Sequence, residues 1–178
     1  MKKTITLVIG GCRSGKSRHA LNKANAVKGQ KKFYIATCVP EDAEMEERVA
    51  RHKKERKDIW HTIEAPIRLD RAILACSKHA DVILVDCLTL WAANLLLEKK
   101  KETQVYDALE TLKQALTLTA CPVYLVSGEA GMGIVPENAS ARQFRDFLGF
   151  INQQMADLAD EVIAVIAGLD IRLKPQKR

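Results

Sequence analysis

The chain has no long apolar run. Its 178 residues are 47% hydrophobic, yet no stretch approaches the roughly 18 uncharged apolar residues that a membrane-spanning helix needs. The apolar run near the N-terminus, residues 5–9, includes a threonine and is too short for a signal peptide. We therefore expect a protein without stable membrane insertion.

The cysteines lack the spacing of a metal site or a disulfide framework. They are odd in number and widely separated, and none belongs to a CxxC pair. Reduced thiols are the simpler interpretation, which favours a cytoplasmic location. The residues concerned are Cys12, Cys38, Cys76, Cys87 and Cys121.

Linkers and internal repeats are also missing. No segment rich in proline, glycine and serine divides the sequence, and the length suits one hydrophobic core. We predict a single nucleotide-binding domain over residues 1–178, with a short, solvated basic tail at 174–178.

Aromatic residues are few, at 5%, while the net charge is +6. A basic chain can bind nucleic acid, but the same charge suits a protein that handles phosphates. The basic clusters at 48–57 and 174–178 contain no interleaved aromatic residues, which a groove for single-stranded nucleic acid would need. We expect phosphate handling and no nucleic-acid partner.

Residues 10–17 read GGCRSGKS and directly follow the apolar run at 5–9. They fit G-x-x-x-x-G-K-[ST], the phosphate-binding loop; the alternative is a glycine-rich turn that matches by chance. Glycines let backbone N–H groups surround a polyphosphate, and the following helix points its positive end at the anion. Lys16 would reach the β- and γ-phosphates, and the Ser17 hydroxyl would bind Mg²⁺.

Strand and helix patterns alternate along the chain. Several strand candidates are apolar without alternation, which is typical of parallel strands covered on both faces. We predict an α/β fold of the P-loop NTPase type, with a mainly parallel sheet, helices on both faces and the site at the carboxyl ends of the strands. The expected strands are 4–9, 33–37, 82–86, 123–127 and 161–166, with a possible return at 169–173, and the expected helices are 16–27, 42–57, 67–78, 90–99, 104–118 and 140–159.

Two acidic residues follow strand candidates. Asp86 ends the run at 82–86, where a P-loop protein places the second carboxylate on the Mg²⁺ side. The alternative is a residue that only caps the next helix. Glu129 has an analogous position after the strand at 123–127.

His52 shares a helical stripe with Met45 and Val49 inside the charged segment 42–57. It either borders a packing interface or acts as a nucleophile. Nearby cations disfavour protonation of the imidazole, and a neutral ring is what attack on phosphorus requires. The glycine-rich segment 128–137 is similarly open between a structural loop and a loop that contacts a ligand.

Together these segments resemble the bifunctional adenosylcobinamide kinase / adenosylcobinamide-phosphate guanylyltransferase family over about residues 4–168. The resemblance rests on GGCRSGKSRHA at 10–20, YIAT at 34–37, RHK at 51–53, Trp60-x-Thr62-x-Glu64, VDCLTLW at 85–91 and GMGIVPEN at 131–138.

The resemblance implies two reactions of cobalamin biosynthesis in a RecA-like homotrimer. The first phosphorylates adenosylcobinamide with GTP or ATP, and the second transfers GMP from GTP to the phosphate through a GMP–histidine intermediate, which releases pyrophosphate. It also implies that His52 and Lys16 are catalytic and that Ser17 and Asp86 bind Mg²⁺. The implied nucleotide-binding residues are Gly10, Gly11, Cys12, Arg13, Ser14, Gly15, Lys16, Ser17, Ala36, Thr37, Cys38, Lys53, Lys54, Glu55, Arg56, Glu64 and Asp86.

Two positions depart from the family pattern. Lys57 replaces a usual proline after the histidine helix, and Gly128 replaces a usual asparagine before Glu129. The second change removes an amide from an expected active-site loop. A P-loop kinase without guanylyltransferase activity, and a RecA-like NTPase stimulated by nucleic acid, are the alternative functions.

Overall fold

The computed structural model describes residues 3–40, 43, 47, 50, 59–98 and 102–175. Within this part of the chain, seven strands form one sheet in the order β3-β2-β4-β5-β1-β6-β7. The strands are β1 (Ile5–Gly10), β2 (Lys32–Ala36), β3 (Trp60–Glu64), β4 (Val82–Asp86), β5 (Val123–Gly128), β6 (Glu161–Ile166) and β7 (Leu169–Lys174). The helices are α1 (Lys16–Asn25), α3 (Leu69–Ser77), α4 (Leu88–Glu98), α5 (Glu102–Leu118) and α6 (Ala139–Leu158).

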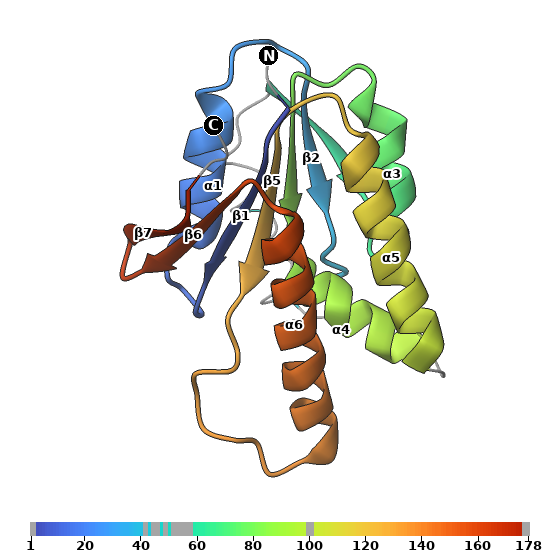
Figure 1. Cartoon of the computed structure of the whole chain (residues 1–178), viewed down its shortest axis with the longest axis vertical. Coiled ribbons are helices and arrows are strands. Elements are labelled where there is room, and N and C mark those ends of the chain that lie inside the picture. The colour runs from blue at the N-terminus through green and yellow to red at the C-terminus, as the bar shows by residue number, and fades with distance from the viewer. Residues whose placement is uncertain are drawn as a thin grey trace.

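Strands β1 to β6 pair in parallel, and only β7 runs antiparallel, against β6. Parallel neighbours require crossover connections, which the helices supply. In Figure 1 the arrowheads of β1, β2 and β5 therefore point to the same end of the sheet, where α4 crosses. The mainly parallel sheet predicted from the sequence is confirmed.

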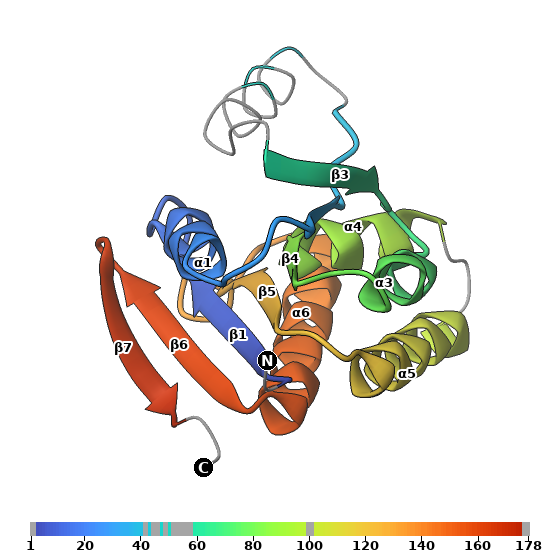
Figure 2. The same ribbon diagram turned by 90° about the horizontal axis from the view of Figure 1, so that it is seen from above.

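The sheet has a buried apolar cluster on each face. One cluster joins Leu7, Val85 and Leu125 to α3, α4, α5 and α6. The other joins Val8 and Leu84 to α1. Figure 2 shows α1 on the opposite side of the sheet from α5 and α6. Because successive residues of a strand point to opposite faces, strands covered on both sides are apolar throughout, as the uninterrupted pattern predicted.

Strand β3 is an addition to the predicted elements. It pairs with β2 at the edge of the sheet and contains His61, which the sequence placed in a loop. Both His61 and Thr62 are exposed, so the segment lacks the apolar run that identified the central strands. At the other edge, Lys174 is not part of a solvated tail as predicted. It ends β7, and its ammonium group donates to the carbonyls of Ala156 and Asp157 at the end of α6.

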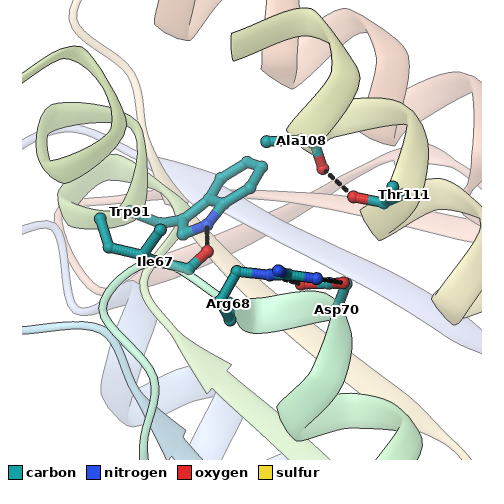
Figure 3. Close-up of polar contacts among 6 residues, drawn as sticks. All are labelled: Ile67, Arg68, Asp70, Trp91, Ala108 and Thr111. Carbon is teal, nitrogen blue, oxygen red and sulfur yellow. Dashed lines mark hydrogen bonds and ion pairs between the residues drawn. The ribbon is translucent and has the colours of Figure 1, made fainter. Parts of the chain in front are cut away.

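Helix α4 is fixed to the segment that connects β3 and α3. The buried Trp91 donates its indole N–H to the Ile67 carbonyl at 2.9 Å, as Figure 3 shows. One turn later, the Asn94 amide donates to the carbonyls of Thr37 and Pro66. These contacts fix the start of α4 against the ends of β2 and β3. Among the described residues, no helix is both long and apolar enough to cross a membrane.

Lys32 connects β2 to the end of α1. It is only 5% exposed, and its ammonium group donates to the carbonyls of Ala24, Asn25 and Val27 at 3.4, 2.7 and 2.9 Å. Burial lowers its pKa, and the charge of Asp81 opposes that shift. The three carbonyls offset the cost of burying the charge, because the last carbonyls of a helix otherwise lack donors.

We expect Lys32→Met to lower the free energy of unfolding by about 1–3 kcal/mol, because it leaves buried carbonyls without donors. Urea denaturation followed by circular dichroism measures this change. Lys31→Met is the matched control, since the Lys31 side chain is exposed and only its backbone N–H bonds to Asp81. Equal unfolding midpoints for the two variants would contradict the capping role.

Candidate active site

The carboxyl ends of five parallel strands align at one edge of the sheet. Gly10 of β1 pairs with Gly128 of β5, and Ala36 of β2 pairs with both Asp86 of β4 and Glu64 of β3. Residues that are far apart in the sequence therefore meet along this edge. This is where open α/β sheets bind their ligands.

The loop between β1 and α1 requires glycine at two positions. A Cβ on Gly10 would lie 2.4 Å from the Val165 carbonyl oxygen and 2.7 Å from Ser14 Oγ. Gly15 has φ = 94° at the N-cap of α1, a left-handed conformation that other residues rarely adopt. The loop thus turns tightly into α1, so that the N–H groups at the start of the helix face the open side of the edge.

The β6–β7 hairpin supports this loop from the side. The Gly168 N–H in the hairpin turn donates to the Ser14 carbonyl at 2.8 Å. A Cβ on Gly15 would be 3.4 Å from Gly168 Cα. The short return strand that the sequence left as a possibility therefore braces the phosphate loop.

Lys16, Ser17 and Asp86 come together at the start of α1. The Lys16 ammonium group folds back to donate to the Gly11 carbonyl at 3.1 Å. Ser17 Oγ donates to Asp86 Oδ1 at 3.3 Å, and the Tyr34 hydroxyl donates to Asp86 Oδ2 at 2.9 Å. The Asp86 carboxylate thus faces the phosphate-loop helix, where the sequence placed a Mg²⁺ ligand.

A hydroxyl and a carboxylate oxygen are the donors that a hard divalent cation prefers. Ser17 and Asp86 therefore fit such an ion when it accompanies a triphosphate in the loop. Among residues 3–40, 59–98 and 102–175, no group of three or more His, Cys, Asp or Glu side chains could hold a metal without a bound nucleotide.

Thr37 fixes the ends of β2 and β4 to each other. Its fully buried hydroxyl donates to the Cys87 carbonyl at 2.7 Å and accepts the Cys87 N–H at 2.8 Å. Burial raises the pKa of the Cys87 thiol to about 11, and the charge of Asp86 adds to the shift. The thiol is therefore protonated and unreactive at neutral pH. Cys38 follows and is half-buried, while Cys12 is exposed in the phosphate loop.

The segment after β5 is attached to the phosphate loop and to α6. The Glu129 N–H donates to the Gly10 carbonyl at 2.9 Å. Ser127 Oγ donates to Asn152 Oδ1 at 2.6 Å, and the Asn152 amide donates to the Gly128 carbonyl at 2.9 Å. Thr89 also accepts the Gly128 N–H, and a Cβ at Gly128 would lie 2.9 Å from Thr89 Oγ1. Glycine at 128 fits this close approach.

The second group of predicted site residues lies outside the described part of the chain. It consists of the predicted nucleophile and the charged residues that follow it: His52, Lys53, Lys54, Glu55 and Arg56. Lys57 lies there too. Their roles stay predictions.

The geometry above agrees with what known proteins show. A family model described as cobinamide kinase / cobinamide phosphate guanyltransferase matches residues 6–173. The chain belongs to this family. The "Bifunctional adenosylcobalamin biosynthesis protein CobU" of Salmonella typhimurium is 41% identical over 180 residues, which cover 94% of this chain and 98% of that protein. The Escherichia coli protein of the same name is 39% identical with the same coverage. The CobP protein of Pseudomonas aeruginosa is 38% identical and covers 94% and 96%.

Solved structures with low sequence identity share the fold. The flagellar accessory protein FlaH of Methanocaldococcus jannaschii is 15% identical, has a TM-score of 0.55 and covers 97% of this chain and 79% of its own. The KaiC-like protein PH0186 of Pyrococcus horikoshii is 18% identical, has a TM-score of 0.52 and covers 90% and 70%. The family member described here is therefore a RecA-like P-loop NTPase, as predicted.

Some site contacts gave no signal in the sequence. Tyr34 contacts Asp86 only because β2 and β4 pair in this register. Asn152 lies on the buried side of α6, where a polar residue indicates a bonded partner without identifying it. Thr89 reads as an ordinary helix residue, although its hydroxyl supports the loop after β5.

Proposed function

We propose that a single triphosphate site at Gly10–Ser17 serves two successive reactions. In the first, the alcohol oxygen of cobinamide attacks the γ-phosphorus of GTP or ATP. The bond from the γ-phosphorus to the bridging oxygen breaks, the nucleoside diphosphate leaves, and the hydroxyl proton passes to solvent. Such a transfer depends on positioning and on neutralising charge, which Lys16 and the N–H groups of the loop supply.

The second reaction uses the α-phosphorus of GTP. A neutral imidazole nitrogen of His52 attacks it, the bond to the β-phosphate breaks, and pyrophosphate leaves with the electron pair. A phosphate oxygen of cobinamide phosphate then attacks the same phosphorus, which breaks the P–N bond and releases the imidazole. The division into two displacements implies ping-pong kinetics.

Ser17 and Asp86 would hold Mg²⁺ with the triphosphate, and the ion would supply positive charge at the phosphate oxygens. The hydroxyl of Tyr34 orients the Asp86 carboxylate toward α1. Ala36, Thr37, Cys38 and Glu64 would contact the nucleotide from the ends of β2 and β3. Lys53, Lys54, Glu55 and Arg56 would complete that site.

The observation that carries this proposal is the meeting of Lys16, Ser17 and Asp86 at one strand edge in a member of this family. We further propose that the chain is one domain and acts as a homotrimer in the cytoplasm without nucleic acid. Five free thiols support a reducing location.

The protein incubated with α-labelled GTP and Mg²⁺ should retain acid-labile label after denaturing gel filtration. The phosphoramidate bond of a GMP–histidine adduct is labile in acid and stable in base, which distinguishes it from a phosphoester. Addition of cobinamide phosphate should release the label as the nucleotidyl product. A protein that transfers γ-phosphate to cobinamide but never retains α-label would be a plain kinase.

A further inference from the structure

The segment between β5 and α6 exposes large apolar side chains beside the phosphate loop. Met132, Ile134 and Val135 are 91%, 96% and 58% exposed. The segment 130–136 contains no charged residue, in a chain that is 28% charged. Exposed apolar side chains that are grouped together generally mark a binding surface.

Both ends of this segment are fixed. At its start, the Glu129 N–H donates to the Gly10 carbonyl, and the Glu129 carboxylate accepts the Gly131 N–H. At its end, the Arg142 guanidinium donates to the Pro136 carbonyl at 3.0 Å, and Asn138 caps α6 through the Ala141 N–H. The exposed side chains therefore project from a loop with anchored ends, and Figure 1 shows this loop extending beyond the edge of the sheet.

The position of the loop restricts what can bind to it. Glu129 is bonded to the first residue of the phosphate loop, so the segment starts next to the place where a triphosphate would lie. An alcohol acceptor must approach the γ-phosphate from the open side of this edge. The first molecule that the apolar loop would meet is therefore the acceptor.

The chemistry of the loop selects among ligands. An uncharged apolar surface does not attract a triphosphate, which is bound by N–H groups and cations. A corrinoid has the complementary chemistry, because its macrocycle presents broad apolar faces and its edge carries neutral amides. Contact with such a face removes apolar side chains from water.

We propose that the loop 130–136 binds the corrin ring of the cobinamide acceptor through Met132, Ile134 and Val135. This inference rests on the proposed function and assigns its acceptor site. The Glu129 and Arg142 contacts keep the apolar segment beside the phosphate loop, so that the bound ring presents its alcohol side chain to the γ-phosphate.

The test is the triple variant Met132→Ser/Ile134→Ser/Val135→Ser, titrated with adenosylcobinamide in the presence of a non-hydrolysable GTP analogue and followed by corrin absorbance. We expect the Kd for the corrinoid to rise roughly tenfold or more, because burial of two or three such side chains is lost. The Kd for the nucleotide should stay within about twofold. The conservative variant Met132→Leu/Ile134→Val should retain corrinoid affinity.

Leu118→Ser is the matched control, since Leu118 is 70% exposed but ends α5 at the opposite edge of the sheet. Its corrinoid Kd should equal that of the wild type. If the triple variant misfolds, Ile134→Ser alone should raise the corrinoid Kd roughly threefold.

Three results would overturn the inference. The first is an unchanged corrinoid Kd in the triple variant, with wild-type activity intact. The second is loss of corrinoid affinity together with a changed oligomeric state in sedimentation, which would make the loop a subunit contact. The third is a wild-type protein that binds nucleotide but no cobinamide, which contradicts the proposed function itself.

Discussion

His52→Ala should retain no covalently bound GMP and still phosphorylate cobinamide at close to the wild-type rate. The two reactions attack different phosphorus atoms. The alcohol attacks the γ-phosphorus directly, whereas transfer of GMP requires a nucleophile at the α-phosphorus. Removing the imidazole therefore abolishes the second reaction, while the groups at the phosphate loop continue to serve the first.

The measurement compares α-label retained on the chain with γ-phosphate transferred to cobinamide. His61→Ala is the matched control, because His61 lies on β3, is exposed, and contacts the Phe33 ring at a centroid distance of 5.2 Å. It should retain label and both activities. Label on His52→Ala at the wild-type level would assign the nucleophile to another residue and contradict the proposal.

The central part of the fold could be predicted because burial leaves a strong signal in sequence. Strands β4 and β6 have the predicted bounds, since Val82–Asp86 and Glu161–Ile166 are mostly apolar runs bounded by polar residues. Strand β3 could not be predicted, because an edge strand covered on one side has few apolar residues. Its pairing with β2 depends on backbone groups rather than on side chains.

The candidate site divides in the same way. The phosphate loop could be predicted, because its glycines and lysine follow from the geometry that a bound phosphate imposes. Asp86 was open between a cap and a metal ligand, and only the sheet order places its carboxylate against Ser17. The corrinoid surface could not be predicted, since Met132 and Ile134 are informative only once they are known to be exposed.

Lys16→Ala should reduce both reactions by about 10³-fold in kcat/KM. In the kinase reaction, the lysine neutralises charge that develops as the γ-phosphate leaves the β-phosphate. In the guanylyl reaction, the same two phosphates become the departing pyrophosphate, so the same ammonium group stabilises the leaving group. Because one triphosphate site is proposed for both reactions, a single substitution at Gly10–Ser17 must affect both.

Lys23→Ala is the control for this variant, since Lys23 is an exposed lysine on the same helix and should leave both rates within about twofold. Steady-state assays of γ-phosphate transfer and of GMP transfer provide the two rates. A Lys16→Ala protein that loses kinase activity but still forms the GMP adduct at the wild-type rate would require a second triphosphate site. The two activities would then share a chain but not a phosphate loop, and the meeting of Lys16, Ser17 and Asp86 at one edge would account for the kinase alone.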